Sequence, residues 1–461
     1  MSGLEGTARD SAGRKAPVKR ARKRGPRIAV AFAVGVLVVS AAAGGLLWWR
    51  FGLLPPGDEV RVFNEHARSL RPEGEPGWPA FRALLVGEFD FDDDSPTPMK
   101  SERTAAFRDA AESARRAQRG SLDDPRVAAH LAKMSGYTRL LPELDAIADM
   151  PVFGYDLRAS EDDTTVNGAL NNVLIGVTLP LSRFGSINNA QMRLDASKGD
   201  WAAVERRMTT GVGLARHMGE PPLGVTRSIG HSNESLAWQS LARALADHPP
   251  PPDVARRLLA AAESLGEPAG LADAVRGELL GLHGLVNAHV ASKRHDLDLF
   301  DLDSLESWIE SPCARVLAKR WRRFWRDAEP VIDLPPPERD TRRPGPSPMP
   351  DILGQDMFTA MTTPRDLCLR DRAGALILLH LCARAAELPA TGNPLALLPE
   401  SLRLDPVTGE PISVEPTAHG RMPFTLLWPK VAREWFTRRE VIPARAEYEE
   451  EPWEATEGAE E

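Results

Sequence analysis

The chain has 461 residues, which is long enough for up to about three domains with a buried core. Its 42% content of hydrophobic residues excludes a chain that is disordered throughout, and three cysteines exclude a scaffold held together by disulfides. A formal net charge of −8 argues against a globally basic nucleic-acid-binding protein, so no nucleic-acid partner is expected.

The N-terminus concentrates positive charge. Residues 1–27 hold nine Lys and Arg against Glu5 and Asp10, whereas the remaining chain holds 48 basic and 63 acidic residues, a net charge of −15. The next 22 residues, Ile28–Trp49, carry no charge. As a helix they would extend roughly 33 Å, close to the hydrocarbon thickness of a bilayer. The sequence therefore predicts a single transmembrane helix over 28–49 that contacts membrane lipid.

The flanks of this segment predict its orientation. The basic segment 1–27 should stay in the cytoplasm because positive charge resists translocation, and Trp48 and Trp49 suit the far interface. This predicts a single-pass protein of the bacterial inner membrane with a cytoplasmic N-terminus and a periplasmic main domain. Two alternatives stay open: Ala41-Ala42-Ala43 matches the cleavage site of a signal peptide, and the segment can also form a buried core helix.

Residues 58–333 predict an outer helical domain. Apolar residues with the helical period predict helices over 101–119, 126–148, 187–197, 201–217, 223–246, 253–264, 271–293 and 305–327. Asp200 and Asp253 are suitable N-caps. Since short loops join long helices, we expect a mainly α fold in which neighbours pack antiparallel. One hairpin has the size of a tetratricopeptide repeat, but no 34-residue repeat recurs, so the array should be irregular.

The rest of the chain is punctuated by proline. Residues 334–350 carry seven prolines without an apolar period, which predicts a linker. Residues 351–430 should hold one strong helix over 365–388 and then a short hairpin or coil appendage. The Glu-rich tail over 445–461 should be solvated.

Two stretches resemble uncharacterised membrane-anchored helical proteins of bacteria. One contains Gly199-Asp200-Trp201-Ala202-Ala203 followed by Leu214-Ala215-Arg216-His217, and the other is the helix over 372–388 with the string DPVTGEP at 405–411. The resemblance implies a location and a fold rather than an activity. The string at 405–411 is also similar to the Asp-Pro turn of type II secretion pseudopilins, but the chain departs from that family because no Gly-Phe-Thr-Leu-Ile-Glu-like processing site precedes Ile28.

Two acidic sets and one histidine pair are candidate metal ligands. Asp90, Asp92 and Asp94 are spaced like the start of a calcium loop, but Ser95 and Ser101 replace its turn glycine and its bidentate glutamate. A second acidic set has leucines between several of its members and indicates a polar stripe: Asp296, Asp298, Asp301 and Asp303. His283 and His289 are six residues apart and so face different sides of a helix. No metal or cofactor is predicted.

The string Gly230-His231-Ser232-Asn233-Glu234 starts like a nucleophile elbow but lacks the closing glycine and lies within a helical pattern. His231 and Glu234 are three residues apart and can meet on one helix face, which leaves a hydrolytic site as an alternative. His380 lies among leucines and is expected to be a core or boundary residue.

The cysteines and asparagines give weaker indications. Cys368 and Cys382 are too far apart on one helix to bond to each other, and Cys313 could pair with either. Five asparagines flank an apolar stretch, where they can line a polar groove or cap helices: Asn167, Asn171, Asn172, Asn188 and Asn189.

The favoured functional prediction is a membrane-anchored binding or scaffold module with a protein partner, because helical arrays present concave surfaces and need no catalytic constellation. The alternatives are a helical hydrolase around His231 and Glu234, and a secretion or envelope-assembly component. No residue is predicted to be catalytic, cofactor-binding or metal-binding.

Overall fold

The computed structural model describes residues 59–89, 101–120, 122–158, 169, 173–280, 322–344, 357–387, 393–416 and 424–427. All of them belong to one compact unit, Leu54–Glu461, whereas the other unit, Met1–Leu53, lies outside the described residues. The predicted basic segment, transmembrane helix and acidic tail therefore lie outside them too. Within the described ranges, no helix combines the length and the apolar character that a membrane span requires.

The described chain is mainly helical, and its N-terminal part consists of short helices. These are α2 (Glu59–Leu70), α3 (Trp78–Phe89), α4 (Glu102–Arg119), α5 (Pro125–Met134), the 3-10 helix η1 (Ser135–Leu140) and α6 (Leu141–Ala148). Ser101 caps α4, because its side chain accepts a hydrogen bond from Thr104 N at 3.2 Å. The range 126–148, predicted as continuous, is divided by η1, and Pro125 and Pro142 lie in the first turns of α5 and α6.

The longest helices follow in the middle of the chain. A π-helical turn, η2 (Leu174–Thr178), leads into α8 (Leu179–Ser197), and then come α9 (Trp201–Gly219), α10 (Gly224–Asp247) and α11 (Pro252–Ser264). Asp200 is the N-cap of α9, as predicted, since its carboxylate accepts from Ala203 N at 3.1 Å. The prediction that Asp253 caps α11 is wrong: Pro251 occupies the cap position, and Asp253 lies in the first turn.

The C-terminal part contains further helices and one strand pair. Residues 272–280 and 322–328 are helical, and α14 (Pro336–Arg342) and α15 (Met357–Ala383) follow. After the 3-10 turns η3 (Ala385–Glu387), η4 (Pro394–Leu397) and η5 (Glu400–Leu402), strand β1 (Ser413–Pro416) pairs antiparallel with β2 (Phe424–Leu427). Ser413 lies opposite Leu427 in this pair, which falls where the sequence predicted a short hairpin.

Part of the predicted linker over 334–350 differs from that prediction, because residues 336–342 form α14. Arg339 on this helix is fully buried, and its guanidinium binds both carboxylate oxygens of Asp366 on α15, with Nη1 3.0 Å from Oδ1. A buried, bidentate ion pair of this kind fixes the segment against the helical body. The prolines at 335–337 precede and begin the helix, where a missing N–H is tolerated.

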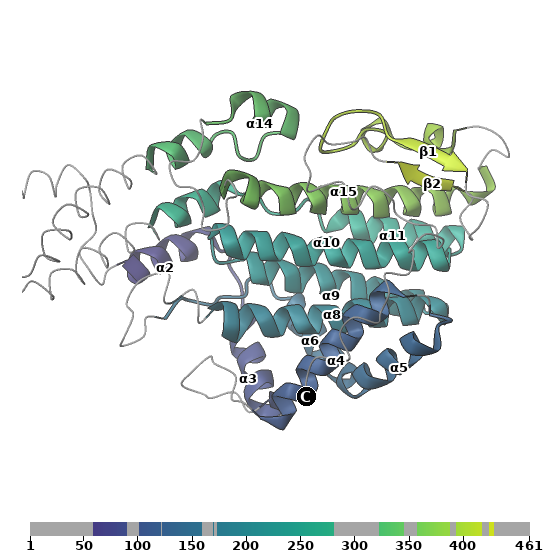
Figure 1. Ribbon diagram of the computed structural model, residues 1–461, viewed down its shortest axis with the longest axis horizontal. Helices are drawn as coiled ribbons and strands as arrows, with labels where there is room; N and C mark the ends of the chain where they lie inside the picture. Colours follow the sequence, from purple (N-terminus) through teal and green to yellow (C-terminus); the bar gives the residue numbers. More distant parts are fainter. Residues whose placement is uncertain are drawn as a thin grey trace, which may run out of the picture. The chain divides into compact units, whose positions relative to one another are not determined.

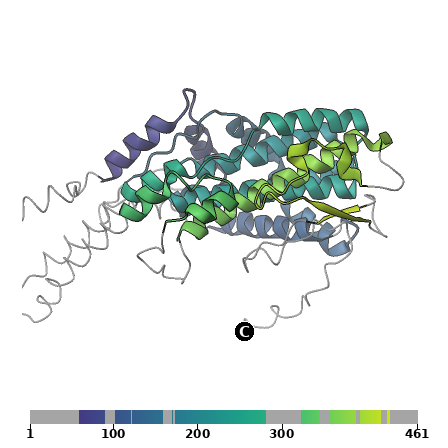
Figure 2. The ribbon, with the colours of Figure 1, turned by 90° about the horizontal axis from the view of Figure 1, so that it is seen from above.

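The long helices are stacked side by side. α15 packs on α10, α10 on α9, α9 on α8 and α8 on α4, and α11 contacts α15 and α9 (Figure 1). The view from above shows the same long helices running next to one another (Figure 2). Short loops at 198–200, 220–223 and 248–251 reverse the chain between them.

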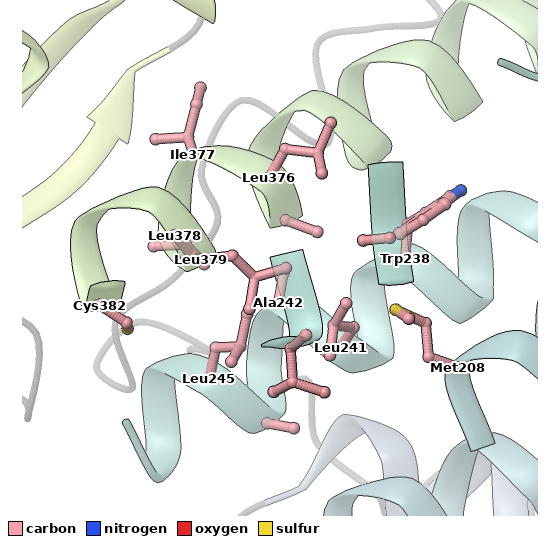
Figure 3. Packing of buried hydrophobic residues seen from close by; sticks show 14 of the residues in the cluster. Met208, Trp238, Leu241, Ala242, Leu245, Leu376, Ile377, Leu378, Leu379 and Cys382 are labelled. Carbon is pink, nitrogen blue, oxygen red and sulfur yellow. The ribbon is translucent and has the colours of Figure 1, made fainter. Parts of the chain in front are cut away.

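Among the residues that the structure describes, three groups of buried side chains hold this stack together. The first contains residues of α8, α9, α10, α11 and α15, and Figure 3 shows Ala242 and Leu245 of α10 beside Leu378 and Leu379 of α15. A second group, rich in aromatic rings, joins α2, α3, α4 and α6 to α8 and α9; there Phe107 and Phe184 have ring centroids 4.6 Å apart. The third joins 271–275 and 324–332 to the start of α15.

Candidate ligand pocket

A cavity of about 450 Å³ opens where α2, the end of α6, α9 and α10 meet. Its apolar lining comes from sequence-distant residues, including Leu70, Met150 and Val212. Five of its lining residues have acidic or basic side chains, together with one histidine: Arg71, Asp149, Arg216, Glu220, Arg227 and His217. The lining thus mixes apolar and polar side chains, and its volume is large enough for a small organic molecule.

Arg71 and Glu220 are held by each other and by the backbone. Arg71 Nε lies 2.7 Å from Glu220 Oε1, its Nη1 lies 2.7 Å from Asp156 Oδ1, and its Nη2 donates to Tyr155 O. Glu220 also accepts from the backbone N–H groups of Phe153 and Gly154. All of these groups are engaged in tying α2 and the 153–156 segment to the end of α9, so they form a rigid wall of the pocket.

His217 and Asp149 are also occupied. His217 Nε2 lies 2.9 Å from Ile147 O, and its ring stacks on Phe153 with centroids 5.2 Å apart. Burial lowers the pKa of His217, so the imidazole is neutral near pH 7. Asp149 is exposed and pairs with Arg206 at 3.0 Å. Neither residue supplies an unbalanced charge to the cavity.

Arg216 is directed toward α10 and the loop after α11. Its Nη1 donates to Leu265 O at 2.6 Å, and its Nη2 lies 3.2 Å from Glu234 Oε1. Glu234 is almost fully buried, and it also accepts from Trp238 Nε1 at 3.4 Å. Arg216 thus balances a buried carboxylate, which leaves this ion pair neutral as a unit.

Arg227, one turn into α10, differs from the other charged groups in the pocket. Within the described part of the chain, its guanidinium makes no hydrogen bond or ion pair, and its Nε is closed off from solvent. Glu220, Asp273 and Asp333 act on it only from beyond ion-pair distance, and burial lowers its pKa. Gly219 on α9 lies beside it, so that a Cβ there would be 3.8 Å from Arg227 Cδ. The pocket therefore contains one cation that the described fold does not neutralise.

The two residues of the hydrolase alternative, His231 and Glu234, have separate partners. His231 Nε2 lies 2.8 Å from Ala269 O, and burial lowers its pKa to about 4. Glu234 is held by Arg216 and Trp238. Ser232, the serine of the elbow-like string, is exposed on α10. Both residues therefore hold α10 against neighbouring parts of the chain through these contacts.

The other residues singled out from the sequence are distributed through the fold. Asn188 is fully buried and bridges α8 to α9, since its Nδ2 donates to Arg207 O at 2.7 Å and its Oδ1 accepts from Arg207 Nη1. Asn189 is also buried there, beside Gly211. His380 is largely buried and lies 3.7 Å from Glu263, in keeping with a boundary position. Cys368 and Cys382 are buried free thiols, and burial raises the pKa of both.

Several candidates lie outside the described residues. They include the histidine pair His283 and His289, the asparagines at 167, 171 and 172, and Cys313. Both acidic sets also lie outside them: Asp90, Asp92, Asp94, Asp296, Asp298, Asp301 and Asp303.

No family model, curated protein or solved structure matches this chain. The pocket is therefore interpreted from its own geometry. Sequence reasoning did not single out Arg71 or Arg227, and it met Arg216 and His217 only as part of the string Leu214-Ala215-Arg216-His217. The pocket brings together residues from position 67 to position 265, and its distinguishing feature is a missing partner, which no local motif encodes.

Proposed function

We propose that this protein is a membrane-anchored binding module whose helical domain lies on the periplasmic side of the bacterial inner membrane. The uncharged segment 28–49 would hold it in the bilayer, and the nine basic residues of 1–27 would keep the N-terminus in the cytoplasm. A protein partner on the periplasmic side remains part of the proposal.

The observation that carries the binding role is the pocket between α2, α6, α9 and α10. Its walls are fixed in advance, because Arg71, Glu220 and His217 are bound to backbone groups on neighbouring elements. Preorganised walls reduce the conformational entropy that the protein loses when a ligand binds. The cavity of about 450 Å³ is within the range that small organic ligands occupy.

Binding is favoured over hydrolysis by the contacts around the alternative site. His231 and Glu234 are each engaged with a different structural partner, and the low pKa of His231 keeps it neutral. A general base needs a free nitrogen within reach of a nucleophile, and Nδ1 of His231 is shielded from solvent. A role in secretion or envelope assembly stays a prediction from the string at 405–411.

The binding role is tested on the full chain, extracted from its own membranes in mild detergent. Small molecules released on denaturation are identified by mass spectrometry for the wild type and for Thr209→Trp, which places a large ring in the cavity from the half-exposed face of α9. Ala202→Trp, on an exposed turn of the same helix, is the control. We expect a bound compound in the wild type and in A202W, and its loss from T209W.

Two results would count against the proposal. Equal recovery of every released compound from T209W and from the wild type would mean that the pocket is not the binding site. Release of the full-length protein from membranes by alkaline carbonate would remove the anchor, because a spanning helix resists that extraction.

A further inference from the structure

We propose that the pocket binds a small amphipathic organic anion, with its carboxylate or phosphate head on Arg227 and its apolar body against Leu70, Met150 and Val212. This inference rests on the proposed binding role and adds the chemical class of the ligand. It follows from which charges in the pocket are already neutralised and which one is not.

The other charged groups are accounted for in pairs. Arg71 is bound to Glu220 and Asp156, Arg216 to Glu234, and Asp149 to Arg206. The neutral His217 adds no charge. Arg227 remains, with no ion pair in the described part of the chain and with its Nε shielded from water. Arg227 as a whole is half-buried, so its guanidinium is partly removed from water without an ion pair, and an oxyanion is the partner that its planar fork of N–H donors fits best.

Arg227 lines the cavity itself, together with the end of α2 and the turn after α6. Its stem packs against the end of α9, where a Cβ on Gly219 would be 3.8 Å from Arg227 Cα and Cδ. The apolar part of the cavity lining includes Leu70, Pro72, Met150, Pro151, Val212 and Leu265. Because Arg71 and Arg216 are already ion-paired, Arg227 is the lining cation left without an ion pair among the described residues. One such cation beside apolar residues favours a ligand with one anionic head and a short apolar body.

The test compares matched ligands and matched variants by thermal unfolding of the full chain in detergent at pH 7.5. The ligands are hexanoate and hexyl phosphate, with 1-hexanol as the uncharged analogue of the same chain length. Arg227→Met removes the charge and keeps the stem. Arg257→Gln, an exposed arginine on α11 paired with Glu205, is the control for removing one charge elsewhere.

At a hundredfold excess over Kd, either anion should raise the melting temperature of the wild type and of R257Q by roughly 4 °C. The rise should be absent in R227M and reduced in Arg227→Lys, which keeps a cation without the planar fork. Hexanol should give a smaller rise that is the same in the wild type and R227M. Should R227M not fold, the comparison of R227K with the wild type decides the question.

Three results would overturn the inference: an equal rise in R227M and the wild type, an equal effect of hexanol and hexanoate on the wild type, or no effect of either anion on the wild type. Thr209→Trp separates this failure from failure of the binding role. If R227M keeps the response and T209W loses it, the pocket binds and only the charge assignment is wrong. If T209W responds fully, the pocket is not the site.

Discussion

At the scale of single residues, Asp405 explains the string DPVTGEP through hydrogen bonds. Its Oδ1 accepts from Val407 N at 3.0 Å, and its Oδ2 accepts from Thr408 Oγ1 at 2.8 Å. Gly409 has φ +72°, a left-handed conformation that glycine adopts without strain, and its N–H donates to Asp405 O. Arg370 of α15 binds both carboxylate oxygens, with Nε 3.0 Å from Oδ1. The turn is therefore self-contained and fastened to α15.

Replacing Asp405 should detach this turn. Both members of the Arg370–Asp405 pair are buried, so Asp405→Ala leaves a guanidinium without its carboxylate and should lower the free energy of unfolding by about 3–5 kcal/mol. Thr408→Val removes the hydrogen bond to the same carboxylate and the exposed one that Thr408 Oγ1 accepts from Glu410 N, and it should lower the free energy of unfolding by about 1–2 kcal/mol. Urea unfolding followed by circular dichroism measures both. If D405A lost less free energy of unfolding than T408V, Asp405 would not be what fastens the turn to α15.

The buried His231 should make stability depend on pH. Its pKa is lowered to about 4, mainly by burial, with Arg365 and Arg227 also disfavouring the proton. As the pH falls below about 6.5, the unfolded chain therefore binds the proton before the folded protein does. The contribution of His231 to the free energy of unfolding is constant above that pH and decreases between about pH 6.5 and 4. Between pH 7.5 and 4.5, His231 should account for a loss of about 2–3 kcal/mol.

The matched variant is His231→Gln, whose amide can still donate to Ala269 O. Carboxylates titrate in both proteins, so the difference between the two pH profiles isolates the histidine. From pH 7.5 to 4.5, H231Q should lose about 2–3 kcal/mol less free energy of unfolding than the wild type, as measured by urea unfolding at both pH values. Parallel profiles for the two proteins would show that His231 is not protonated preferentially in the unfolded state.

At the scale of elements, local sequence patterns predicted where most helices lie. Several helix ends, however, are set by burial against other parts of the fold. The Asp200 cap was readable because its hydrogen bond to Ala203 N is local. The start of α15 could not be predicted from local signals. The sequence predicted a helix from Arg365, after Pro364, whereas α15 begins at Met357 and contains that proline. Phe358 and Met361 are buried against 271–275 and 324–332, and this packing outweighs the hydrogen bond lost at Pro364.

The crossing of α9 and α10 depends on glycine. A Cβ at Gly230 would lie 2.9 Å from Ala215 O and 2.9 Å from Gly219 Cα, and both of these are backbone atoms. Gly230→Ala should therefore push the helices apart and lower the free energy of unfolding by about 1–3 kcal/mol. Gly185→Ala in α8 is the control, because nothing lies within 4 Å of its added methyl group.

G185A should instead raise the free energy of unfolding by about 0.5–1 kcal/mol, since alanine restricts the unfolded chain more than glycine does. The midpoints of urea unfolding compare the two variants directly. Equal stability of G230A and the wild type would show that the helices can separate slightly without loss, and that close approach is not required at this crossing.

At the scale of the whole molecule, the sequence predicted a mainly helical chain of packed neighbours, but it did not predict the pocket. The helical period is visible within one segment, whereas the pocket needs α2, α6, α9 and α10 to meet. Arg227 looks like any other arginine until its neighbours are placed. The same holds for Arg339 in the predicted linker, whose partner Asp366 is 27 residues away.

If segment 28–49 anchors the protein as proposed, the charge of the N-terminal segment should decide the orientation. The nine Lys and Arg of 1–27 face only Glu5 and Asp10, whereas 28–49 carries no charge, so the basic end should remain in the cytoplasm and the chain after it should cross. Alkaline phosphatase fused after residue 440 of the full chain should therefore be active, because it matures only outside the cytoplasm. A β-galactosidase fusion at the same position should be inactive. Replacing the nine basic residues with glutamine should lower phosphatase activity by weakening the bias, and an active β-galactosidase fusion on the unaltered chain would reverse the assigned topology.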